Sequence, residues 1–231
     1  MDFSKRSVIT ELMDNPAVPI TEVEIALQEL ELINKFLGGR ALLLNALPKA
    51  GFKDYLTIMD LGSGSGDMLR IISNYAKKKG FLSIRLFGVD INPAMTTIAK
   101  YRSGNFPEIK FVTQNIWNDE LFDYKPDILI NNHFCHHFDD EQLIELVKRM
   151  CKLARKSIII NDLHRHKFAY YSIKFLTALF SKSYLVKNDG PLSVARALTK
   201  MEWKNILFKA GISNYEINWK WAFRWQIIIL K

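Results

Sequence analysis

The sequence is poor in cysteine and has no long apolar run. Cys135 and Cys151 are its two cysteines among 231 residues, which excludes a scaffold held by many disulfides and favours free thiols in a reducing compartment. No segment reaches the roughly 18 consecutive apolar residues of a membrane span, and acidic residues interrupt the first twenty positions. We therefore expect no transmembrane segment and no signal peptide, and a cytoplasmic location.

The chain also lacks a concentrated basic tract, although it is basic overall. Its 32 lysines and arginines outnumber 24 acidic residues, giving a net charge of +8. Apart from Lys77-Lys78-Lys79 these residues are scattered, which favours a solvated basic face over nucleic-acid binding. The charge suits an anionic small-molecule substrate or an acyl carrier protein. The length and a hydrophobic content of 48% fit one sizeable α/β domain.

Glycine is informative through its placement. Segment 58–67 predicts a buried strand ending in Asp60, a turn with glycines at every second position (Gly62, Gly64 and Gly66), and then a helix. Such a turn lets the backbone approach a ligand, and the helix start offers unpaired N–H groups. The spacing differs from the G-x-G-x-x-G of dinucleotide loops, and Asp67 suits a ligand with an ammonium group better than a pyrophosphate. The loop therefore favours S-adenosylmethionine over NAD.

The next three strands are also expected to end in ligand-type residues. Segment 84–90 ends in Asp90, whose carboxylate can accept hydrogen bonds from both ribose hydroxyls. Segment 109–113 leads to Asn115, an amide suited to the adenine amino group, and to the apolar Ile116. Segment 127–130 leads to Asn131.

These segments resemble the class I S-adenosylmethionine-dependent methyltransferases. The match rests on 60–66, Gly88-Val89-Asp90, Asn115-Ile116 and 127–132, followed by His136-His137, and covers about residues 55–165. It implies an α/β, Rossmann-like fold: a seven-stranded, mostly parallel sheet with one reversed strand and helices on both faces. It also implies a cofactor site at the strand ends (Arg40, Asp60, Gly62, Gly64, Gly66, Asp90, Ile91, Asn115, Ile116 and Asn131). Many family members have Asp where this chain has Asn115.

Two flanking regions are expected to enclose the acceptor. Residues 1–50 are predicted to form a helical cap, with a capping box at Thr21 and Glu24 and with Arg40 as a candidate partner of the cofactor carboxylate. Within the core, residues 51–231, a lid insertion at about 164–198 is predicted to cover the open end of the sheet. Its candidate substrate contacts are Arg165, Tyr170 and Tyr171. The aromatic stretch 168–180 fits two other roles, packing on the core and lying on a membrane surface between flanking lysines.

All five histidines follow either the fourth expected strand or a fifth one at residues 157–162, where ligands of open α/β sheets bind. We predict that His133 or His164 removes a proton from a hydroxyl acceptor. His136 and His137 are predicted to pack and cap the next helix. No metal site is predicted, because neighbouring side chains on one strand cannot all face one ion.

The predicted reaction is O-methylation of a small acceptor, phenolic or polyketide-like, free or bound to a carrier protein, with S-adenosylmethionine as donor. That acceptor class follows from a resemblance to bacterial secondary-metabolite methyltransferases and from the aromatic insertion. N- or C-methylation would use the same cofactor site. Two further alternatives are a nicotinamide-dependent oxidoreductase, which the glycine spacing disfavours, and a non-catalytic partner protein.

Overall fold

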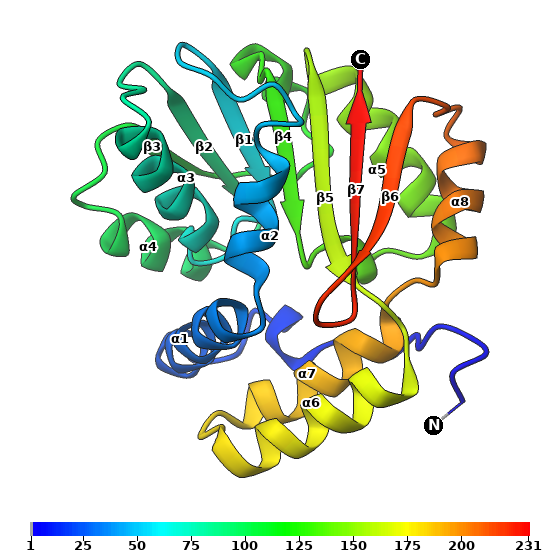
Figure 1. The fold of residues 1–231 in the computed structure, drawn as a ribbon. Helices are drawn as coiled ribbons and strands as arrows, with labels where there is room; N and C mark the ends of the chain where they lie inside the picture. Colours follow the sequence, from blue (N-terminus) through cyan, green and yellow to red (C-terminus); the bar gives the residue numbers. More distant parts are fainter. Residues whose placement is uncertain (1) are drawn as a thin grey trace.

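The computed structural model describes residues 2–231, which build one seven-stranded sheet in the order β3-β2-β1-β4-β5-β7-β6 (Figure 1). The strands are β1 (Thr57–Leu61), β2 (Arg85–Asp90), β3 (Ile109–Thr113), β4 (Ile128–Asn132), β5 (Ser157–Leu163), β6 (Tyr215–Lys220) and β7 (Arg224–Leu230). Of these seven strands β7 alone is reversed, and it pairs antiparallel with β5 on one side and β6 on the other. The predicted fold, with one reversed strand, is confirmed. The carboxyl ends of β1 to β5 therefore meet along one edge.

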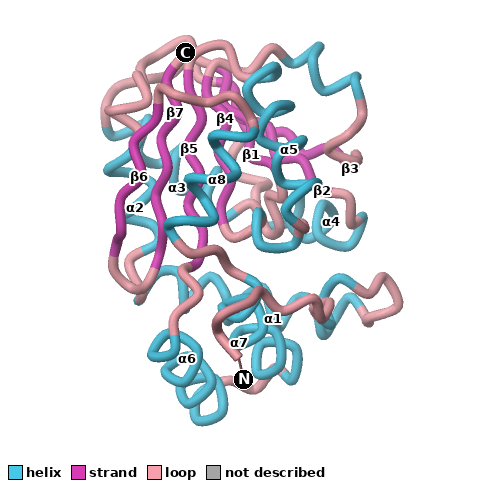
Figure 2. Tube along the Cα trace, turned by 90° about the vertical axis from the view of Figure 1, so that its right-hand side faces the viewer, coloured by secondary structure: helices cyan, strands magenta, loops and turns pink. Residues whose placement is uncertain are grey.

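Helices cover both faces of the sheet (Figure 2). One face packs on α2 (Gly39–Ala46), α3 (Asp67–Lys78) and α4 (Pro93–Arg102), and the other on α5 (Asp140–Leu153) and α8 (Lys200–Lys209). Successive strand side chains point to opposite faces, so Ile58 joins the first core and Met59 the second. Two covered faces explain why the central strands are continuous apolar runs.

A third layer lies beyond the carboxyl ends of the parallel strands (Figure 1). It contains α1 (Ile20–Phe36), α6 (Lys167–Phe180) and α7 (Tyr184–Arg196). Ala26 of α1 packs on Leu185 and Val186 of α7, while Val23 and Leu27 pack on α4. Three short 3-10 turns complete the description: η1 (Leu12–Asp14), η2 (Asp119–Tyr124) and η3 (Cys135–His137).

The start of α1 differs from the prediction. The helix begins at Ile20 behind Pro19, and no side chain caps it. Thr21 therefore lies inside the first turn, and the predicted capping box at Thr21 is wrong. Proline fixes φ in the range that a helix start needs, so the helix can begin there without a hydroxyl cap. Across residues 2–231 no helix has both the length and the apolar character that crossing a bilayer requires.

Candidate active site

The glycine loop joins β1 to α3 through three glycines in the left-handed region, with φ of +72°, +49° and +75° at Gly62, Gly64 and Gly66. Gly62 and Ser63 donate backbone hydrogen bonds of 2.9 and 3.0 Å to the carbonyl of Val89, which fixes the loop to β2. A side chain at any of the three glycines would be strained, because only glycine occupies this region freely.

The three glycines differ in how much room a Cβ atom would have. A Cβ at Gly62 would lie 2.4 Å from Phe134, and one at Gly66 would lie 2.4 Å from Phe111. At Gly64 the nearest atom would be a methyl of Leu27 at 3.9 Å. Packing therefore requires Gly62 and Gly66, whereas Gly64 leaves open space above the backbone, which is where a ligand can approach closely.

Asp90, at the end of β2, faces this loop. Its Oδ2 accepts the N–H of Gly64 at 3.0 Å, and its Oδ1 accepts the N–H of Asn92 at 2.9 Å. Burial raises the pKa of Asp90, although these two hydrogen bonds favour its charged form. Each carboxylate oxygen has a second lone pair, so the predicted bonds to ribose hydroxyls remain available. Ile91, which follows it, is largely exposed.

Two acids beside the loop have oxygens that find no hydrogen-bond partner among the described residues, namely Asp60 Oδ1 and Asp67 Oδ2. Burial, with the nearby charges of Asp67 and Asp90, raises the pKa of Asp60 well above its usual value. Burial and the neighbouring Glu31 raise the pKa of Asp67 to about 6. Buried, unpartnered carboxyl oxygens are costly unless a ligand pairs with them, and a cation suits them. These residues fit the ammonium group of S-adenosylmethionine.

Glu31 ties α1 to the loop. Its Oε1 accepts the hydroxyl of Ser65 at 2.6 Å and forms ion pairs with Arg70 at 3.0 Å and Arg102 at 2.9 Å. The predicted cofactor contact Arg40, on α2, lies close enough to Asp67 to lower that residue's pKa, and its Nε has no hydrogen-bond partner within residues 2–231. Arg40 is thus available to an anionic group near the loop.

Three residues predicted to bind the cofactor, Asn115, Ile116 and Asn131, lie in different settings. Asn115 is exposed, and its Oδ1 accepts the backbone N–H of Trp117 at 3.1 Å. Ile116 is buried in the core behind it. Asn131 is fully buried, donating to the carbonyl of Leu61 at 2.9 Å and accepting from Cys135 at 3.0 Å. Ile116 and Asn131 are therefore placed as structural residues rather than on a ligand-facing surface, which corrects the expectation for both.

His133 follows β4 with a φ of +52°, a backbone conformation that residues other than glycine seldom adopt. Its N–H donates to the carbonyl of Asn161 at 2.9 Å, which holds the backbone in place. Burial and the charge of Arg224 lower the pKa of His133 to about 3. The imidazole is therefore neutral at physiological pH and has a nitrogen lone pair.

Arg224 is a site residue that sequence reasoning missed. It opens β7, is almost completely buried, and donates from Nη1 to the carbonyl of Leu37 at 3.0 Å. Burial lowers its pKa to about 10, and its Nε lacks a partner in the part of the chain that the structure describes. The sequence feature that could have identified Arg224 is its position at the start of an otherwise mostly apolar strand.

His164, the second predicted catalytic histidine, follows β5. Its ring centroid lies 4.8 Å from that of Trp225 and 5.5 Å from that of His166. Burial, with the charges of His166 and Arg165, lowers the pKa of His164 to about 4. His164 Nδ1 has no hydrogen-bond partner among residues 2–231. His164 is therefore also neutral, with one ring nitrogen uncommitted.

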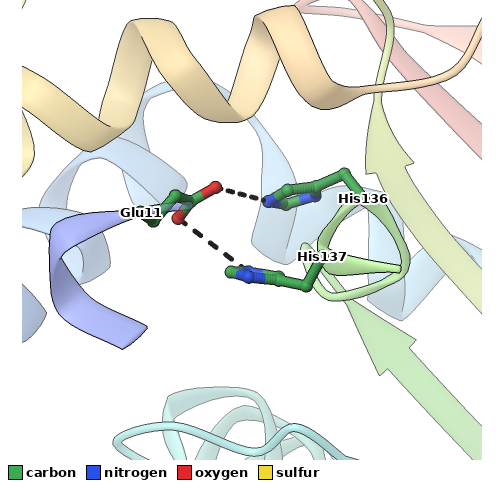
Figure 3. Close-up of side chains that lie close together, drawn as sticks. All are labelled: Glu11, His136 and His137. Carbon is green, nitrogen blue, oxygen red and sulfur yellow. Dashed lines mark ion pairs between the residues drawn. The ribbon is translucent and has the colours of Figure 1, made fainter. Parts of the chain in front are cut away.

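His136 lies in a buried charge cluster rather than at a helix cap (Figure 3). Its Nδ1 is 2.7 Å from Asp162 Oδ1, and its Nε2 is 3.4 Å from Glu11 Oε1. His137 Nε2 lies 3.9 Å from the other oxygen of Glu11. Burial alone would lower the pKa of His136, but Asp162 and Glu11 raise it to about 10. Glu11, His136 and His137 each offer an atom that could bind a metal ion, and these atoms lie within 4.8 Å of one another. The ion pairs of a protonated His136 account for this arrangement without a metal.

The predicted substrate contacts in segment 164–198 fall into two groups. Arg165 is buried, and its guanidinium binds the carbonyls of Phe3 and Ala197 and the carboxylate of Glu202. It is committed to the fold, so the expectation that it steers an anionic group is corrected. Tyr170 and Tyr171 pack edge-on against Phe3, and Tyr170 also lines a hollow between the N-terminal segment, α6 and α7.

The parallel strand edge, the glycine loop and the acid after β2 define an α/β enzyme domain that binds a nucleoside-containing cofactor. Residues 58–157 match the family model of a methyltransferase domain. Residues 58–157 are therefore a methyltransferase domain, and its methyl donor is S-adenosylmethionine. This finding removes the oxidoreductase alternative. A search of the curated proteins found no match to this chain.

Solved structures share the fold at low sequence identity. Human N-acetylserotonin methyltransferase in complex with SAM has a TM-score of 0.64 and 18% identity, covering 91% of this chain and 55% of that chain. A Nostoc punctiforme PCC 73102 protein proposed to be an O-methyltransferase has a TM-score of 0.64 and 16% identity, and the alignment covers 99% of this chain and 65% of that protein. Magnesium protoporphyrin IX methyltransferase from Synechocystis PCC 6803, with bound SAM, has a TM-score of 0.55 and 14% identity, and the alignment covers 84% of this chain and 80% of that protein.

Proposed function

We propose that this enzyme methylates an oxygen atom of a small acceptor, of the phenolic or polyketide type, free or held on a carrier protein. The names of the human and Synechocystis proteins specify small-molecule acceptors, and oxygen is named for the Nostoc protein. The observation that carries the proposal is the left-handed backbone of His133 at the end of β4, with the buried Arg224 near enough to lower the pKa of its imidazole. Unusual backbone held by its surroundings is typical of functional sites.

The residues divide the work between donor and acceptor. S-adenosylmethionine, when bound, supplies an electrophilic methyl group. Asp60 and Asp67 would receive its ammonium group, Asp90 the ribose and Asn115 the adenine. His133 accepts the hydroxyl proton as a neutral imidazole, and the guanidinium of Arg224 favours the resulting negative charge on oxygen.

The test uses purified protein, isotope-labelled S-adenosylmethionine and three matched acceptors: a phenol, the corresponding aniline and a carbon acid. We expect the methyl ether as the product that mass spectrometry identifies. His133→Asn keeps a residue that tolerates positive φ and should lower kcat about 100-fold while leaving the Kd for the cofactor unchanged. Methylation of the aniline or of carbon, without the ether, would contradict O-methylation.

Two further variants locate the base. His164→Asn tests the second neutral histidine, because the base is the residue whose loss removes the acidic limb of the kcat profile, where protonation of the base lowers the rate. His166→Asn is the matched control: His166 accepts the N–H of Phe168 as the cap of α6, and asparagine can do the same. We expect wild-type activity from this control.

A further inference from the structure

The outer face of α6 exposes large apolar side chains. Phe168, Phe175 and Leu179 are 72%, 66% and 61% exposed, and their spacing puts them on one side of the helix. The opposite side, with Ala169 and Thr177, is buried. A monomeric protein seldom leaves a contiguous apolar face of this kind in water unless it serves an interaction.

The exposed face continues onto the turn between β6 and β7, at the same end of the molecule (Figure 1). The ring of His166 stacks on Phe168 at 5.6 Å and on Phe223 at 4.9 Å, and Phe223 meets Trp219 at 5.9 Å. Trp221, on the same turn, is 66% exposed. We call the combined surface the aromatic face; it consists of Phe168, Phe175, Leu179, Phe180, Trp219 and Trp221.

The α6 part of the aromatic face lies in a segment that carries positive charge and no negative charge. Residues 163–188 contain no aspartate or glutamate, and four lysines among them are exposed (Lys167, Lys174, Lys182 and Lys187). One acid approaches from α1: Glu29 accepts the backbone N–H groups of Lys182 and Ser183, and so is committed to the start of α7. The surface thus combines aromatic side chains with a cationic rim.

We propose that the aromatic face docks this enzyme on the surface of a lipid bilayer that contains anionic lipids. Exposed tryptophans suit the headgroup region, and lysines beside an apolar helix face suit acidic lipid. With 14 residues, α6 is shorter than the roughly 20 that span a bilayer, so it lies in the interface. In a dimer formed through this face, the lysines of one copy would lie against the same lysines of the other. The repulsion between them disfavours self-association through this face.

The position of α6 gives the docking a consequence. The helix forms the outermost part of the layer beyond the carboxyl ends of the strands (Figures 1 and 2). If the proposed methylation takes place at these strand ends, the acceptor enters from the side that meets the lipid. Docking itself does not depend on that function, and cofactor binding reports on the function separately.

Vesicle flotation tests the proposal with the full-length protein. The probes are vesicles of phosphatidylcholine alone and of phosphatidylcholine mixed with phosphatidylglycerol. We expect the protein to float with the anionic vesicles and to remain behind with the zwitterionic ones. Phe175→Ser combined with Leu179→Ser should lower the partition coefficient at least tenfold, and Lys167→Gln with Lys174→Gln should lower it about fivefold per lysine.

The control carries the same changes far from the aromatic face, on α8. Phe208 and Lys204 are exposed there, so Phe208→Ser with Lys204→Gln should float as the wild type does. An equal loss in this control, or no binding to anionic vesicles, would overturn the proposal. So would a lipid-free dimer that Phe175→Ser with Leu179→Ser converts to a monomer. Calorimetric titration of S-adenosylmethionine should give the same Kd for every variant, which shows that each is folded.

Discussion

His136 Nδ1 lies 2.7 Å from Asp162 Oδ1, and the backbone N–H of His136 donates to Asp162 Oδ2 at 2.9 Å. One carboxylate thus holds both the ring and the backbone of η3 at the end of β5. The other ring nitrogen faces Glu11, so a single imidazolium joins the sheet edge to the N-terminal segment. This edge of the site is held by a charge that is stabilised only in the folded chain.

Asp162→Asn should destabilise the protein by about 3–5 kcal/mol, because removing one member of a buried ion pair leaves the other uncompensated. Urea unfolding measures the change. Asp123 is exposed, so Asp123→Asn should stay within about 0.5 kcal/mol of the wild type. A loss below 1 kcal/mol for Asp162→Asn would mean that Asp162 does not stabilise a charged His136.

Stability should fall at alkaline pH. The folded pKa of His136 is raised to about 10 from its usual 6.5, so its contribution is complete below pH 6.5 and is lost as the pH rises through 10. The expected slope is up to about 1.4 kcal/mol per pH unit. Unfolding curves between pH 6.5 and 10 measure it. His136→Gln should lack this slope, and a wild type with no slope in this range would refute the assignment.

Asp67→Asn should stabilise the cofactor-free protein and weaken cofactor binding. The raised pKa of Asp67, about 6, means that its charge opposes folding above that pH. Removing the charge should add about 1–3 kcal/mol at pH 7.5, and the gain should shrink between pH 6 and 4. Calorimetry should show at least tenfold weaker S-adenosylmethionine binding at pH 7.5. Unchanged affinity would remove Asp67 from the proposed ammonium contact.

Sequence reasoning found those site residues whose position is determined by a short stretch of neighbouring sequence. The strand, the three glycines and the following helix lie within ten residues, so spacing alone placed Gly64 and Asp67 on one turn. Asp90 follows from a second local pattern of the same kind. The alternation of strands and helices then gives a parallel sheet, whose carboxyl ends share one edge.

Residues that depend on distant contacts were missed or misassigned. Glu11 reaches His136 across 125 positions of sequence, and the setting of Arg224 depends on how β7 pairs with β5. Arg165 has the composition of an anion-binding residue, but Glu202 and two carbonyls use its guanidinium. Local patterns carry no information about which partner a long side chain finds after folding.

Alanine at two glycines of the loop should separate folding from binding. Gly66→Ala meets Phe111 and a positive φ together, so we expect a loss of about 2–5 kcal/mol in the free energy of unfolding. Gly64→Ala meets the positive φ without a clash, so we expect a loss of about 1–2 kcal/mol. The added methyl group at Gly64 should nevertheless weaken S-adenosylmethionine binding about tenfold, because it occupies the open space. Equal effects of the two changes on both measurements would contradict this division.

Three histidines, His133, His136 and His164, should titrate in separate ranges, which proton NMR of their ring resonances can follow. His133 and His164, with pKa values lowered to about 3 and about 4, should stay neutral down to about pH 5. His136 should stay protonated up to about pH 9. His133→Asn, His164→Asn and His136→Gln assign the three signals. A His133 signal that titrated near pH 6.5 would show an imidazole exposed to water, and the neutral acceptor proposed for the hydroxyl proton would then be absent below that pH.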